Sequence, residues 1–66
     1  MNIKQLMQIV LMGIRENAIR YCYDEILDKG YTKMSTDGNA QKRAVEIELM
    51  FGVQTHVDKN IIKLKQ

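Results

Sequence analysis

The sequence of 66 residues has no proline, no tryptophan, one cysteine and one histidine. A single cysteine cannot close an intramolecular disulfide, and one cysteine with one histidine cannot supply the four ligands of a structural zinc site. Disulfides and structural zinc sites, which most often stabilise very small domains, are therefore excluded. A lone cysteine is also typical of a reducing compartment, so we expect a cytoplasmic location.

The remaining composition is that of an ordinary globular domain, with 45% hydrophobic and 27% charged residues. A chain of this length buries only about 60% of the surface that its unfolded form exposes, which leaves little stability to a lone core. We expect one domain spanning residues 1–66. Association with a second copy is the device that remains to stabilise it.

Two segments have apolar residues at intervals of three and four, the spacing of a helix with one apolar face. The first covers about 2–29, from a candidate N-cap at Asn2 to Gly30. Its apolar stripe rotates beyond Gly13, so it is either bent there or packs against different neighbours along its length. The second covers about 37–51 and ends before Gly52.

Residues 53–66 fit two structures. Val53, Val57, Ile61 and Leu64 would share one helical face. The alternation of Val53, Thr55 and Val57, followed by a polar Asp58-Lys59-Asn60 turn, instead indicates a β-hairpin. The sequence therefore predicts an all-α fold with a short C-terminal helix, and the alternative is an α+β fold with a C-terminal hairpin.

The first predicted helix is unusually apolar at its start, because residues 3–14 hold eight large apolar side chains. A straight helix of that total length would measure about 40 Å, whereas a compact globule of this size has a diameter of roughly 28 Å. An apolar helix that outreaches its own domain needs a second chain to cover it. We expect a homodimer whose interface comprises Ile3, Met7, Val10 and Ile14.

This apolar stretch predicts no membrane association. Gln8 interrupts it, and it is far shorter than the roughly 20 residues that cross a bilayer. Arg15 and Glu16 also follow where a signal peptide would have a small-residue cleavage site.

The formal net charge of +2 resides entirely in residues 53–66, since the rest of the chain is balanced. Read as a helix, this segment presents polar and basic side chains on one face. The residues predicted to bind a macromolecular partner are His56, Lys59, Asn60 and Lys63.

The stretch 47–54 followed by 61–64 resembles a helix-turn-helix DNA-binding motif, with Gly52 in the turn and apolar Val53 after it. That resemblance implies a small dimeric transcriptional regulator. Two positions depart from the pattern: Glu48 stands where a small residue is usual, and Asp58 where an apolar one is. Both place a carboxylate near the helix–helix contact, which favours a protein partner over DNA.

Chemistry at a catalytic or metal centre is not indicated. Asp24 and Asp28 lie one helical turn apart, but two carboxylates are too few for calcium. Cys22 has no neighbouring base, and His56 has no nucleophile beside it. We expect no enzyme, cofactor, metal or small-molecule substrate.

The hypothesis is thus a small self-associating interaction protein. Its size is that of many phage or mobile-element inhibitors and regulators of host macromolecules.

Overall fold

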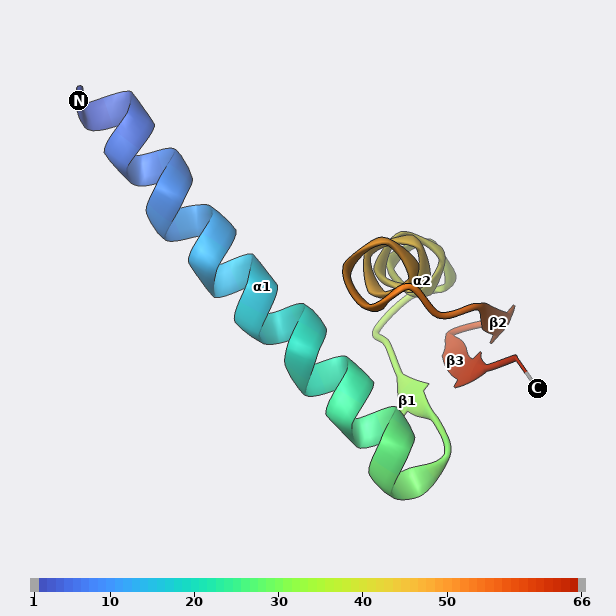
Figure 1. The fold of residues 1–66 in the computed structure, drawn as a ribbon. Coiled ribbons are helices and arrows are strands. Elements are labelled where there is room, and N and C mark those ends of the chain that lie inside the picture. The colour runs from blue at the N-terminus through green and yellow to red at the C-terminus, as the bar shows by residue number, and fades with distance from the viewer. Residues whose placement is uncertain (1, 66) are drawn as a thin grey trace.

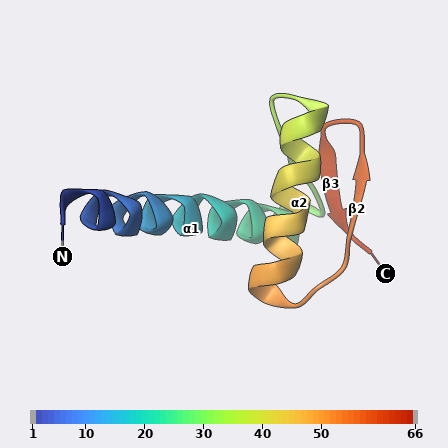
Figure 2. The ribbon, with the colours of Figure 1, turned by 90° about the horizontal axis from the view of Figure 1, so that it is seen from above.

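The computed structural model describes the backbone of residues 2–65 and the side chains of residues 2, 3 and 15–65. The chain forms two helices and three short strands (Figure 1). In chain order the elements are α1 (Ile3–Lys29), β1 (Thr32–Lys33), α2 (Asp37–Phe51), β2 (Thr55–Asp58) and β3 (Ile61–Leu64). The strands form one antiparallel sheet in the order β1-β3-β2, and α2 packs on one of its faces (Figure 2).

The predicted all-α fold is wrong, because residues 55–64 form a hairpin instead of a helix. The hairpin is the alternative that the alternation of apolar residues leaves open. A two-stranded hairpin alone is marginal in water. Here β1 supplies a third strand, pairing Thr32 with Ile62 and Lys33 with Ile61, and α2 covers the apolar face. This tertiary support decides between two local structures of similar propensity.

Both predicted helices are confirmed, and their ends follow from local chemistry. The Thr36 hydroxyl caps α2 by accepting a hydrogen bond from the backbone N–H of Asn39 at 3.0 Å. Gly52 ends α2 with φ at +66°, a left-handed conformation that is strained for other residues, and its N–H bonds the Glu48 carbonyl at 2.9 Å.

Helix α1 is continuous from Ile3 to Lys29, so the chain does not break near Gly13. Its C-terminal half packs against the rest of the chain, and its N-terminal half projects beyond α2 and the sheet (Figures 1 and 2). The molecule measures 43 × 21 × 17 Å for this reason. The apolar stripe therefore rotates because a continuous helix has different surroundings along its length, and not because the helix breaks.

The core lies where α1, α2 and the sheet meet. Ile47 and Ile62 are its two fully buried large side chains, one from α2 and one from the central strand β3. Tyr23 and Phe51 close one side of it with stacked rings whose centroids lie 4.1 Å apart. The other buried apolar residues are Ile19, Ile26, Ala40 and Ala44.

Candidate functional site

The sheet has one covered and one open face, and the open face gathers basic side chains. Val57 on β2 and Ile62 on β3 are paired and point toward the core. Successive side chains on a strand point to opposite faces. His56 and Lys63, which are also paired, therefore lie on the open face, and both are exposed. The open face thus places side by side two of the residues that the sequence predicted to bind a partner.

Strand β1 adds a residue that sequence reasoning missed. Lys33 pairs with Ile61, which shares the open face with Lys63. The sequence indicates only a turn at Lys33, because a strand of two residues gives no periodic signal. Its position on the sheet depends on a partner strand that lies 28 residues further along the chain.

The open face continues past the ends of the strands. The N–H of Lys65 donates to the carbonyl of Gln54 at 2.9 Å, so pairing extends one step beyond β3. Lys65 is exposed, and it alternates in phase with Lys63. Tyr31 immediately precedes β1, and its side chain is 43% exposed. We call Tyr31, Lys33, His56, Lys63 and Lys65 the basic sheet face.

The excess of positive charge lies with the sheet. The two helices hold seven carboxylates and six basic side chains and are nearly neutral, whereas the rest of the chain has four lysines and one carboxylate, Asp58. The small net charge of the protein is therefore concentrated in one region. A surface potential of one sign attracts polyanions even when the whole protein is nearly neutral.

The other two predicted partner-binding residues, Lys59 and Asn60, form the hairpin turn between β2 and β3. Lys59 is exposed and has a left-handed backbone with φ of +57°. Asn60 is half-buried. Its side-chain Nδ2 donates a hydrogen bond to the Met34 backbone carbonyl at 2.8 Å, and the Asn60 backbone carbonyl accepts one from the Met34 N–H at 2.7 Å. The Asn60 side chain thus fastens the hairpin to the segment between β1 and α2.

Replacing Asn60 therefore tests a structural role. Asn60→Ala is expected to lower the free energy of unfolding by about 1 kcal/mol, because the part-buried Met34 carbonyl loses its side-chain donor. Urea denaturation followed by circular dichroism measures the change. Asn39→Ala is the control, since its amide bonds the Ser35 hydroxyl in an exposed position. Equal effects of the two substitutions would refute the anchoring role.

The predicted dimer interface lies on the projecting half of α1. Ile3 is 77% exposed. The side chains of Met7, Val10 and Ile14 lie outside those that the structure describes. Further along the same helical stripe, Ala18 is exposed and Tyr21 is 70% exposed. Contact with the core comes from a different side of α1, which carries Ile19, Cys22, Tyr23 and Ile26.

A charged cluster joins α1 to α2 where the projecting half begins. The Glu46 carboxylate is paired with Arg15 from α1 and with Arg43 one turn earlier on α2. Nε of Arg43 is buried without a hydrogen bond and lies 3.4 Å from Glu46 Oε1, while Nη1 lies 3.8 Å from Cys22 Sγ. This arrangement links α1 to α2 and places a guanidinium group, not a carboxylate, next to the Cys22 thiol.

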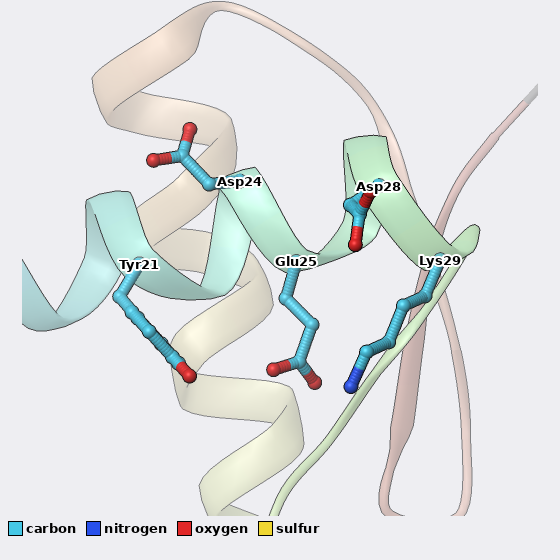
Figure 3. Close-up of a pocket in the computed structure, with 5 residues that line it drawn as sticks. All are labelled: Tyr21, Asp24, Glu25, Asp28 and Lys29. Atoms are coloured by element: carbon cyan, nitrogen blue, oxygen red, sulfur yellow. The ribbon is translucent and has the colours of Figure 1, made fainter.

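The C-terminal half of α1 borders an open hollow that carries the acidic residues (Figure 3). Glu25 accepts a hydrogen bond from the buried Thr32 hydroxyl at 3.1 Å, so its role is to satisfy that group. Asp24 points away from Tyr21, Glu25 and Lys29, which lie on one side of the helix (Figure 3). Among the described residues, no three His, Cys, Asp or Glu side chains gather as metal ligands would.

No helix in the described part of the chain combines the length and apolar composition needed to cross a membrane. Comparison with known proteins finds no matching family model and no significant match among curated proteins or solved structures.

Proposed function

We propose that this chain is a small self-associating protein that acts by binding another macromolecule and carries out no catalysis. The observation that carries the proposal is the division of α1 into two apolar stripes. One stripe, through Ile19, Cys22 and Ile26, packs inside the molecule. The other runs through Ile3 and Tyr21, which are both exposed.

In the sequence, Ile3 and Tyr21 belong to the helical stripe that also contains positions 7, 10 and 14. These positions fall on the half of α1 that projects beyond the sheet and α2 (Figure 2). Residues on one helical stripe are covered together when a second helix packs along them. A second copy brings an identical apolar stripe, so two projecting helices cover each other in a symmetric dimer.

The basic sheet face is the surface that such a dimer would offer to its macromolecular partner. It lies on β1, β2 and β3, away from the projecting half of α1 (Figures 1 and 2). The helix-turn-helix alternative depended on a recognition helix over 53–66. Between Gly52 and residue 65 the structure has strands, a turn and no helix.

The dimer is tested by a charge placed in the apolar stripe. Val10→Glu is expected to convert a dimer into a monomer at tens of micromolar, because two buried carboxylates would face each other across the interface. Size exclusion with multi-angle light scattering measures the mass. Gln8→Glu is the matched control: it adds the same charge two positions away, on the opposite side of the helix. A wild-type chain that is monomeric under these conditions would contradict the proposal.

A further inference from the structure

We infer that the basic sheet face binds single-stranded nucleic acid. This inference rests on the proposed function in one respect, namely that the chain binds a macromolecule. It adds that the macromolecule is a single-stranded nucleic acid. It concerns side chains that are remote from the apolar stripe of α1. The two ideas can therefore fail separately.

The first argument is charge complementarity. Lys33, Lys63 and Lys65 lie on one face of one small sheet, and Lys59 adds a fourth ammonium group at its turn. The only carboxylate on these strands is Asp58, which is paired with Ile61 on the same face, so the lysines outnumber it there. Residues two apart on a strand are spaced by about 6.6 Å, which is the spacing of Lys63 and Lys65, and Lys33 lies on the neighbouring strand β1. The phosphates of a nucleic-acid backbone carry repeated negative charges that these lysines can neutralise.

The second argument separates nucleic acid from protein. Protein interfaces are depleted in lysine and are anchored by buried aromatic, apolar or arginine side chains. The basic sheet face has lysines and no arginine, since Arg15, Arg20 and Arg43 all lie on the helices. Ile61, the one large aliphatic residue on the open face, is already half-buried. Apart from Tyr31, this face therefore lacks the anchors of a protein-binding surface.

The third argument favours single strands over duplex. His56 provides a ring on the open face opposite Lys63, and Tyr31, which is two residues before Lys33, provides a second exposed ring next to β1. Exposed rings beside cationic groups stack with unpaired bases, whereas the bases of a duplex are stacked on each other and offer only their edges. Among the described residues, no helix follows Gly52 that could enter a major groove.

The experiment uses the full chain and a fluorescein-labelled oligothymidylate of about 12 nucleotides, within the range that such faces occupy. Fluorescence anisotropy in about 50 mM salt is expected to show saturable binding, weaker for a duplex of the same length. Lys33→Gln with Lys63→Gln should reduce affinity at least about tenfold. It should also lower the slope of log K against log salt by about 1.4, or 0.7 for each phosphate that is no longer neutralised.

Two matched controls keep the result specific to this face. Lys29→Gln with Lys42→Gln removes the same charge from exposed positions on α1 and α2, and it should leave affinity within about twofold. Tyr31→Ala should weaken binding at least about fivefold because a stacking ring is removed, and Leu27→Ala, which truncates an exposed side chain on α1 away from the dimer stripe, should not.

Each remaining outcome overturns the inference. Absence of oligonucleotide binding would remove nucleic acid as the partner, and the mass of the wild-type dimer would still report on self-association. Tighter binding of the duplex would refute the assignment to single strands. Equal losses of affinity in the two double-lysine variants would mean that binding depends on the total charge of the protein and not on the basic sheet face.

Discussion

Ile47→Ala is expected to lower the free energy of unfolding by about 3 kcal/mol, the largest effect of any single substitution considered for this chain. Ile47 is fully buried on the face of α2 that meets the sheet. Truncation removes apolar packing and leaves a cavity that rigid neighbours fill only in part. A domain of this size has only a few kcal/mol of stability, so much of the variant is expected to unfold near 37 °C.

Leu49→Ala is the matched control, because Leu49 lies two residues away on the same helix and is 82% exposed. Its effect should remain below about 0.5 kcal/mol. Urea denaturation of both variants at one fixed protein concentration separates core packing from any contribution of association. Similar losses in the two variants would mean that α2 presents its other face to the core.

Glu46→Ala is expected to cost about 2 kcal/mol, because it leaves Arg43 partly buried and without its counter-charge. The Glu46 and Arg43 side chains are only 16% and 18% exposed. Complete burial would make the loss larger, and this residual access to water reduces it. Arg15 loses the same partner, so the contact between α1 and α2 is weakened as well.

The control is Glu16→Ala, which removes an ion pair with Arg20 on the exposed side of α1. The expected loss is below about 0.5 kcal/mol, and it should vanish in high salt, whereas the Glu46 effect should persist. Thermal or urea unfolding at low and high salt measures both. A salt-dependent loss in the Glu46 variant would show that its carboxylate is solvated.

The position of Glu48 shows how a local pattern can mislead. Against a helix-turn-helix pattern, its carboxylate is an unfavourable group at a packing position. In the structure the chain after Gly52 is extended, and Glu48 Oε2 accepts a hydrogen bond from the N–H of Thr55 at 2.9 Å. The same carboxylate therefore satisfies the first residue of the edge strand β2, where an unpaired N–H would otherwise remain.

The sequence by itself determined the two helices and their ends, because periodicity, caps and left-handed glycines act within a few residues. It also showed that residues 3–14 are densely apolar. Only the tertiary structure decided that residues 55–64 are strands, because the choice depended on β1 and on the covering face of α2. The basic sheet face depended on the same event: antiparallel pairing brings Lys33 beside Ile61 on the face of Lys63, and no local pattern records a contact across so many residues.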